Sequence, residues 1–180
     1  MNQDRDPTRP PDVSPDAEAT RLLLEGLQAG ATIKDLKGVS SDTLEGVYAL
    51  AYRFYQNGQL EEAETFFRFL CLYDFYNAEY ALGMGAVLQL KRDYDKAISM
   101  YAVAQALDLQ DDRAIFHVGQ CQLALGRLSK ARDCFEAVAG RAADPDMVGR
   151  CQAYLQALEG TTEPATPAQE EPEAPWPPAA

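Results

Sequence analysis

The chain has 180 residues, a formal net charge of −12 and a pI of about 4.4, and 47% of its residues are hydrophobic. The length and apolar content allow one solenoid or one ordinary domain with a continuous core. The excess of carboxylates disfavours direct binding to nucleic acid, because that affinity depends on Lys and Arg that displace counterions from phosphates.

The N-terminal part of the chain is predicted to hold one helix and one shorter helical segment. Residues 1–13 are rich in Pro and Asp and are expected to form a disordered tail. A helix is predicted from Ser14 to about Ala29, because a Ser cap precedes Pro at the first helical position. The segment from Thr32 to Leu36 is expected to add one or two helical turns. No secretory signal or membrane span is expected, since no apolar run reaches the roughly 18 to 20 residues that a span requires.

Three alanines recur with a period of 34 residues, and an aromatic residue follows each of them after four positions. The alanines are Ala63, Ala97 and Ala131, and the aromatic residues are Phe67, Tyr101 and Phe135. This period is typical of the tetratricopeptide repeat, a helix–turn–helix unit that stacks into a superhelix. We therefore predict an all-α, TPR-like superhelix of three tandem helix-turn-helix repeats, with an N-terminal helix and a C-terminal capping helix. The repeats are 44–77, 78–111 and 112–145.

Small residues are expected at the turns and close approaches within the repeats. The helices are predicted at 44–57 and 60–73, at 78–91 and 94–107, and at 112–125 and 128–140. Gly58 and Gly126 fall in turns that favour a left-handed backbone, and Arg92 holds the same place in the second repeat. Gly85 and Gly119 are expected to let the two helices of a repeat approach closely.

The repeats are followed by a predicted capping helix and a tail. A helix from about Asp146 to Leu158 follows Asp144 and Pro145, a suitable cap and first-turn proline. It is expected to cover the exposed edge of the third repeat. The folded domain is thus predicted to span residues 14–159. Residues 160–180 are rich in Pro, Glu and Ala and are expected to be a disordered tail.

The candidate site lies on the first helix of each repeat, which lines the concave side of such a superhelix. In the first repeat the inward stripe is Tyr48, Tyr52 and Tyr55, spaced by four and three residues. The corresponding residues are Leu82, Ala86, Gln89 and Leu90 in the second repeat, and Phe116, Gln120 and Leu123 in the third. This aromatic and apolar stripe predicts a groove for an extended segment with apolar anchors, rather than a clamp for a terminal carboxylate.

Such a stripe can instead belong to the core. Separate residues, Leu50, Phe54, Phe67 and Leu70, are available to fill the core, which favours the binding interpretation. The sequence offers no catalytic or metal-binding pattern. Four cysteines are scattered without a CxxC pair, His117 is the only histidine, and no nucleophile–base pair or phosphate loop can be assembled. We expect reduced core cysteines, no cofactor and no enzymatic activity.

Several segments resemble the class II chaperones of bacterial type III secretion, in particular its invasion-system members. They are Glu61 to Asn77, Tyr101-Ala-Val-Ala104 and Gly119-Gln-Cys-Gln-Leu123, within a resemblance that covers about residues 20–158. The resemblance implies a cytoplasmic chaperone that keeps two different hydrophobic translocator proteins soluble and apart before secretion. It implies that a short N-terminal segment of the translocator binds in the concave groove, where Tyr48, Tyr52 and Tyr55 match aromatic positions.

The resemblance also implies further partners. Invasion-type members of the family bind an AraC-type transcription activator when free of translocators, and family members often form homodimers. The alternative interpretation is a generic tetratricopeptide scaffold for an unrelated cytosolic complex.

Overall fold

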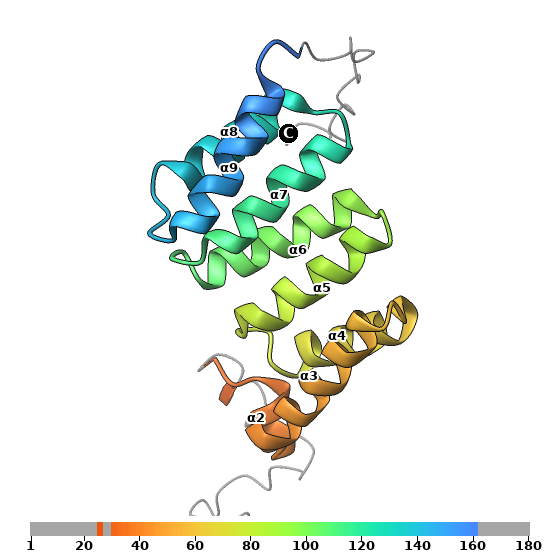
Figure 1. The fold of residues 1–180 in the computed structure, drawn as a ribbon. Helices are drawn as coiled ribbons and strands as arrows, with labels where there is room; N and C mark the ends of the chain where they lie inside the picture. The colour runs from red at the N-terminus through yellow and green to blue at the C-terminus, as the bar shows by residue number, and fades with distance from the viewer. Residues whose placement is uncertain (1–24, 27–29, 162–180) are drawn as a thin grey trace, which may run out of the picture. The chain divides into compact units, whose positions relative to one another are not determined.

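The structure is a computed structural model that describes residues 25–26 and 30–161 (Figure 1). Within these residues the regular elements are all helices, and none of them combines the length and the hydrophobicity of a membrane span. The chain divides into two compact units, Met1–Asn77 and Ala78–Ala180. Their boundary is the predicted junction between the first and second repeats. The predicted helix from Ser14 to Ala29 and the two predicted tails lie almost wholly outside the described residues.

In the first unit, α3 (Ser41–Gln56) and α4 (Leu60–Tyr73) pack as a helical hairpin. The side chain of Ser40 accepts a hydrogen bond from the Thr43 N–H and so caps the start of α3. The turn between the helices contains Gly58, whose φ of 72° lies in the left-handed region. The side chains that join the two helices include Ala63, Phe67 and Leu70, all at most 1% exposed.

A short helix, α2 (Ile33–Lys37), precedes this hairpin and agrees with the predicted segment from Thr32. Thr32 and Asp35 form a capping box, in which each side chain is bonded to the other residue. The hydrogen bonds that Thr32 donates, from its hydroxyl first and its backbone N–H second, hold the pKa of Asp35 below its usual value. Lys34 Nζ lies 2.6 Å from Asp74 Oδ2, and this ion pair ties α2 to the end of α4.

In the second unit, five helices pack in chain order, each against the next (Figure 1). They are α5 (Ala78–Leu90), α6 (Tyr94–Leu107), α7 (Asp112–Ala124), α8 (Leu128–Ala139) and α9 (Pro145–Leu158). The pairs α5–α6 and α7–α8 are the predicted second and third repeats. Their turns contain Arg92 with φ 64° and Gly126 with φ 74°, so the left-handed turn is present even where the residue is not glycine.

Two glycines allow the helices of each pair to approach closely, as expected from the sequence. A Cβ atom on Gly85 would lie 2.6 Å from Cε1 of Tyr101. A Cβ atom on Gly119 would lie 2.7 Å from Cε1 of Phe135. Both aromatic rings are 0% exposed, so the missing side chains leave the space that the rings occupy.

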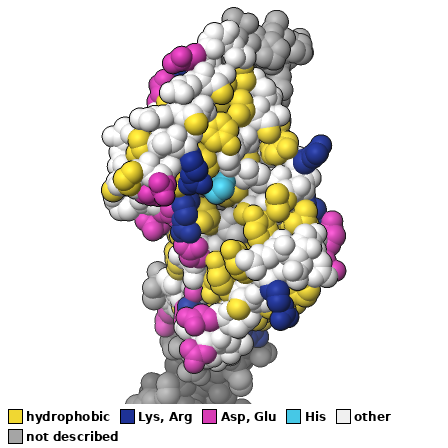
Figure 2. Space-filling view, viewed as in Figure 1, with side chains coloured by type: hydrophobic (Ala, Val, Ile, Leu, Met, Phe, Trp, Pro, Cys, Tyr) yellow, Lys and Arg dark blue, Asp and Glu magenta, His cyan; other side chains and the backbone are white. Residues whose placement is uncertain are grey.

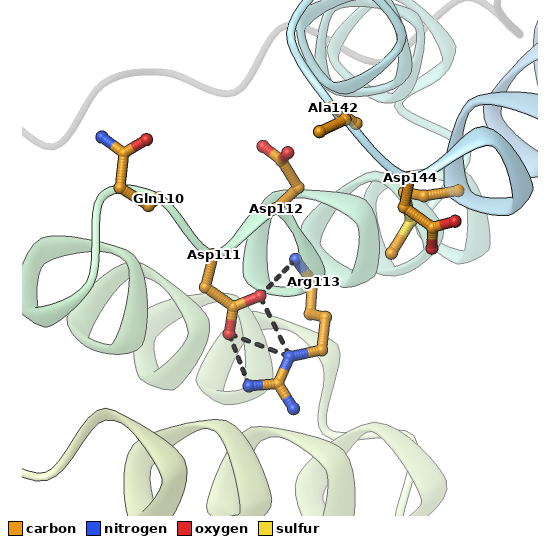
Figure 3. A pocket seen from close by; sticks show the side chains of 8 residues that line it. Gln110, Asp111, Asp112, Arg113, Ala142 and Asp144 are labelled. Atoms are coloured by element: carbon orange, nitrogen blue, oxygen red, sulfur yellow. Dashed lines mark hydrogen bonds and ion pairs between the residues drawn. The ribbon is translucent and has the colours of Figure 1, made fainter.

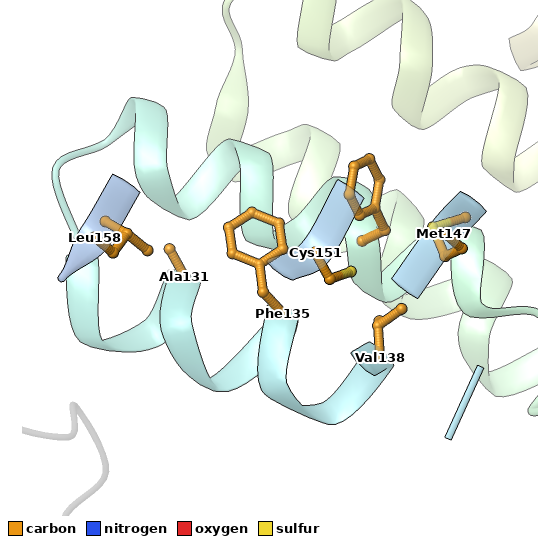
Figure 4. Close-up of a cluster of buried hydrophobic side chains, with 7 residues drawn as sticks. Ala131, Phe135, Val138, Met147, Cys151 and Leu158 are labelled. Atoms are coloured by element: carbon orange, nitrogen blue, oxygen red, sulfur yellow. The ribbon is translucent and has the colours of Figure 1, made fainter. Parts of the chain in front are cut away.

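The last helix covers the third repeat, which confirms the predicted capping helix (Figure 4). The side chain of Asp144 caps α9 by accepting from the Asp146 N–H, with Pro145 in the first turn. The residues buried between α7, α8 and α9 are Phe116, Ala131, Phe135, Val138, Met147, Cys151 and Leu158. Tyr154 stacks on Phe135 with ring centroids 4.6 Å apart.

All four cysteines are free and half-buried or buried, as predicted: Cys71, Cys121, Cys134 and Cys151. Burial raises the pKa of both Cys71 and Cys121 to about 11. Since the thiolate is the reactive form, these two side chains act as small apolar core residues.

Candidate peptide-binding site

The tyrosines predicted on the first repeat form a stacked row along α3. The ring centroids of Tyr48 and Tyr52 are 6.4 Å apart, and those of Tyr52 and Tyr55 are 6.0 Å apart. Tyr52 is 45% exposed, whereas the other two are half-buried. The ring centroids of Tyr48 and the buried Phe67 are 5.9 Å apart in an edge-on contact. The tyrosine row therefore packs directly on the core.

Two residues expected in the core of the first unit behave as predicted. Phe67 and Leu70 are buried, and Phe54 stacks on Phe66 of α4 with ring centroids 5.4 Å apart. Phe54 therefore faces the partner helix of the hairpin, while Tyr52 on the same helix remains accessible. Phe54 and Tyr52 thus lie on different sides of α3, one in contact with α4 and the other with solvent. This arrangement favours a surface row of rings over a core stripe.

The other seven predicted residues lie on α5 and α7 of the second unit. Leu90 is 52% exposed. Leu82, Ala86, Gln89, Gln120 and Leu123 are half-buried. Figure 2 shows the only histidine, His117, at the surface between hydrophobic side chains and dark-blue Lys or Arg side chains. We call the sides of α3, α5 and α7 that carry the ten predicted residues the helix A faces.

A chain of hydrogen bonds crosses the helix A faces of the second unit. The hydroxyl of Tyr101 donates to Gln89 Oε1 at 2.7 Å, and Gln89 Nε2 donates to Gln120 Oε1 at 3.3 Å. Gln120 Nε2 in turn donates to the hydroxyl of Tyr154 at 2.9 Å. These bonds orient two amide groups that each keep a second N–H, because an amide nitrogen carries two donors. Such a row can hydrogen-bond the main chain of an extended peptide.

Phe116 differs from the expectation, because its ring is only 2% exposed and belongs to the core under α9. The guanidinium carbon of Arg150 lies 4.6 Å from the centre of this ring and covers it. Phe116 is buried because α9 packs against it: the ring centroids of Tyr154 and Phe116 are 5.8 Å apart. Phe116 therefore packs in the core beneath the helix A face of α7 and is not available to contact a ligand.

His117 joins the polar chain through Nδ1, which lies 2.9 Å from Gln120 Oε1. Its ring also stacks on Tyr101 with centroids 5.2 Å apart. Burial, and to a smaller extent the charges of Arg150 and Arg113, lower the pKa of His117. The imidazole is therefore neutral at pH 7, and since an amide oxygen only accepts, Nδ1 carries the proton.

A separate small pocket lies where the loops before α7 and α9 meet (Figure 3). It has a volume of about 270 Å³ and an acidic rim. The carboxylates already have structural roles: Asp111 caps α7 and pairs with Arg113, and Asp144 caps α9. Asp112 Oδ1 is 2.5 Å from Nε of Arg141. Within the described residues there is no group of three or more side chains that could hold a metal ion.

Sequence reasoning missed two side chains on this surface, Arg150 and Tyr154. A signal for them exists in the period of 34 residues, which continues into α9. Tyr154 lies 34 residues after Gln120, with which it shares a hydrogen bond. Arg150 lies 34 residues after Phe116, whose ring it covers. The helix α9 thus holds the position that the first helix of a fourth repeat would take, and it contributes side chains to the face as well as to the core.

The comparisons with known proteins agree with this architecture. The tetratricopeptide repeat family model matches residues 44–77 and 80–111. The chaperone protein SicA of Salmonella typhimurium is 48% identical over 138 residues, which cover 77% of this chain and 84% of SicA.

Two solved structures of peptide complexes are also similar to this chain. The type III secretion chaperone SycD of Yersinia enterocolitica, in complex with a peptide of the translocator YopD, is 35% identical with a TM-score of 0.63. That match covers 67% of this chain and 95% of the other. PcrH in complex with the chaperone binding region of PopD is 36% identical with a TM-score of 0.64, over 68% and 95% of the two chains.

The paired helices define an all-α tetratricopeptide-repeat protein. Its first unit carries the row of tyrosines on α3, and its second unit carries the amides on α5 and α7. With the identity to SicA and the similarity to SycD and PcrH, the chain belongs to the class II translocator chaperones of type III secretion.

Proposed function

We propose that this protein is a bacterial cytoplasmic chaperone that binds two different hydrophobic translocator proteins before secretion. It keeps them soluble and apart by binding an extended N-terminal segment of each on the helix A faces. The observation that carries this proposal is the stacked row of tyrosines with its exposed member, Tyr52. The peptide complexes of SycD and PcrH support it, because those proteins bind translocator segments with a related fold.

The chemistry of the two faces suits such a cargo. Each tyrosine has an apolar ring for a Leu or Pro side chain and a hydroxyl that stays in contact with water. Burying one anchor side chain contributes roughly 1.5–3 kcal/mol, whereas association costs about 4–15 kcal/mol. Tyrosine contacts alone therefore give weak binding, so the cargo must make further contacts. In the second unit, the amides of Gln89 and Gln120 offer hydrogen bonds to a main chain.

The proposal is tested by co-expression with a translocator and by the variant Tyr52→Glu. Binding should weaken by more than about tenfold, because a charge that loses its water without a partner costs several kcal/mol. The matched control is Tyr76→Glu, since Tyr76 is 55% exposed and lies outside the tyrosine row. The measurement is the affinity for a translocator peptide, with helical content monitored by circular dichroism. Normal binding by Tyr52→Glu would contradict the site.

Co-expression also separates the chaperone from a generic tetratricopeptide scaffold. A chaperone keeps an otherwise insoluble translocator in the soluble fraction, whereas a scaffold for an unrelated complex does not. We expect no enzymatic step and no cofactor in this activity, since binding alone masks the apolar segments of the cargo.

We further propose that the free chaperone acts as co-activator of an AraC-type transcription activator, as the family resemblance implies. With a net charge of −12 the chain itself is repelled by DNA, so any effect on transcription must pass through the protein partner. A reporter dependent on the activator should respond to this protein, and added translocator should reverse the response. The resemblance also supports a homodimer, which sedimentation of the cargo-free protein tests.

A further inference from the structure

Arg150, on α9, places a positive charge at the helix A face of the second unit. Its guanidinium carbon lies 4.6 Å from the centre of the Phe116 ring on α7. Tyr154 follows one helical turn later on the same side of α9 and shares a hydrogen bond with Gln120. Burial is the main cause that lowers the pKa of His117, and the charge of Arg150 adds to it. Figure 2 shows Lys or Arg side chains beside His117. Arg150 therefore lies next to the amide and the imidazole of this face.

The guanidinium of Arg150 is held in place but keeps most of its hydrogen-bond donors. It carries five N–H groups, and Nη2 donates to the thioether sulfur of Met147 at 3.2 Å, which is a weak acceptor. Within the part of the chain that the structure describes, no carboxylate forms an ion pair with Arg150. Asp146 lies one helical turn earlier on α9 and is exposed to solvent, but it does not pair with Arg150 either. The remaining donors of Arg150 face water.

Arg113, which also lies near His117, differs from Arg150 in this respect. The guanidinium of Arg113 pairs with the carboxylates of Asp111 and Glu79, so its charge is balanced within the fold. The charge of Arg150 is not balanced in this way, although the chain as a whole carries a net charge of −12. A cation on the face proposed to bind cargo favours a partner group of opposite charge.

The chemistry of Arg150 selects a carboxylate. A guanidinium presents its N–H groups as a planar fork that matches the two oxygens of a carboxylate. One side of the fork already lies on the Phe116 ring, so little further freedom is lost when an anion binds. We propose that Arg150 is a specificity-determining residue that selects translocator segments with an Asp or Glu side chain, whose carboxylate pairs with its guanidinium. Because it concerns the same cargo surface, this specificity rests on the proposed function.

The test compares two synthetic peptides of the chaperone-binding segment of a translocator. One has the natural sequence, and in the other every Asp and Glu is replaced by Asn or Gln. The full-length protein should bind the natural peptide about three- to tenfold more tightly, as a partly exposed charged hydrogen bond does. The difference should shrink when NaCl is raised from about 0.05 to about 0.5 M, because salt screens the charges. Isothermal titration calorimetry measures both affinities.

The variant Arg150→Met assigns the preference to this side chain. Methionine keeps an unbranched apolar side chain over Phe116 but has no charge, so the variant should bind both peptides with about equal affinity. If it fails to fold, Arg150→Gln, whose planar amide also fits over the ring, provides the same test. The matched control is Lys130→Met, which removes one exposed positive charge from α8 and should keep the preference of the wild type. A merely structural role of Arg150 would change the melting temperature without changing the preference.

Three results would overturn the proposal. The wild-type protein binds both peptides equally, the natural segment contains no Asp or Glu, or Arg150→Met keeps the preference for the natural peptide. A failure of the proposed function gives a different result. In that case neither peptide binds the wild-type protein, or Tyr52→Glu binds both of them as well as the wild type does.

Discussion

Single residues set how closely the helices of each repeat approach. Gly85 and Gly119 lie opposite the buried rings of Tyr101 and Phe135, and a methyl group at either position would overlap its ring. In an exposed helix, replacing glycine by alanine is favourable by about 1 kcal/mol, because glycine loses more backbone freedom. At these two positions the steric cost opposes that gain.

We predict that Gly85→Ala lowers the free energy of unfolding by about 1–3 kcal/mol, the usual cost of overpacking a core. Gly149→Ala is the matched control, because Gly149 is also helical and a methyl group there would meet no neighbouring side chain or helix within 4 Å. That variant should be more stable than the wild type by up to about 1 kcal/mol. Urea denaturation followed by circular dichroism measures both. Equal stability of the two variants would show that α5 and α6 can separate freely.

At His117 we predict a loss of stability on mild acidification. Its pKa is lower in the folded protein than the unfolded value of about 6.5, first because of burial and then because of Arg150 and Arg113. The unfolded state thus binds the proton more strongly. Stability is complete above about pH 6.5 and falls as the pH drops from there toward the folded pKa. The melting temperature should show this fall, and His117→Gln should reduce it. If the melting temperature of His117→Gln fell with pH as much as that of the wild type, the loss of stability would come from carboxylates rather than from His117.

At the scale of elements, α9 serves two purposes. It shields the aromatic core of the third repeat with Met147, Cys151 and Leu158, and it brings Arg150 and Tyr154 to the helix A face. Terminal repeats need such a cover, because each repeat otherwise exposes the apolar side that would face its next neighbour. The stability of α7 and α8 therefore depends on a helix outside their own repeat.

The variant Cys151→Asp tests this dependence. An unpaired carboxylate at a position that is 0% exposed should cost about 3–5 kcal/mol, which is a large part of the stability of a small domain. We expect α9 to detach, so that amides of α7 and α8 exchange faster and the dye ANS binds the uncovered core. Gln152→Asp changes the exposed neighbour and should do neither. Unaltered exchange in Cys151→Asp would mean that α9 is dispensable.

At the scale of the whole molecule, the net charge of −12 affects stability and partner choice. Like charges repel one another across the compact state, and salt screens that repulsion with a Debye length of about 10 Å at 0.1 M. The individual surface ion pairs, such as Arg127 with Asp95, contribute little in comparison.

We therefore predict that the melting temperature rises when NaCl is increased from a low to a high concentration. Replacing two exposed carboxylates, in the double variant Glu62→Lys with Glu136→Lys, should raise the melting temperature at low salt and reduce the response. Calorimetry at several salt concentrations measures both effects. A melting temperature that falls with salt would show that attractive ion pairs dominate the surface.

Much of the fold could be predicted because it depends on local spacing. The hairpins, the left-handed turns at Gly58, Arg92 and Gly126, and the capped start of α9 all follow from residues close together in the chain. The candidate site was harder to predict. The helical period places Phe116 and Gln120 on one side of α7, but their side chains lie at the border between the core and the surface. The rotation of α7 against α9 decides which of them is buried.

Paired helices with a period of 34 residues, a capping helix and a row of tyrosines on α3 could all be predicted from the amino-acid sequence, because a repeat encodes local backbone geometry and spacing. The packing between helices settled two further features: Phe116 lies under Arg150, and hydrogen bonds link Tyr101, Gln89, Gln120 and Tyr154. These features depend on contacts between helices distant in sequence, whose packing angles no single segment specifies.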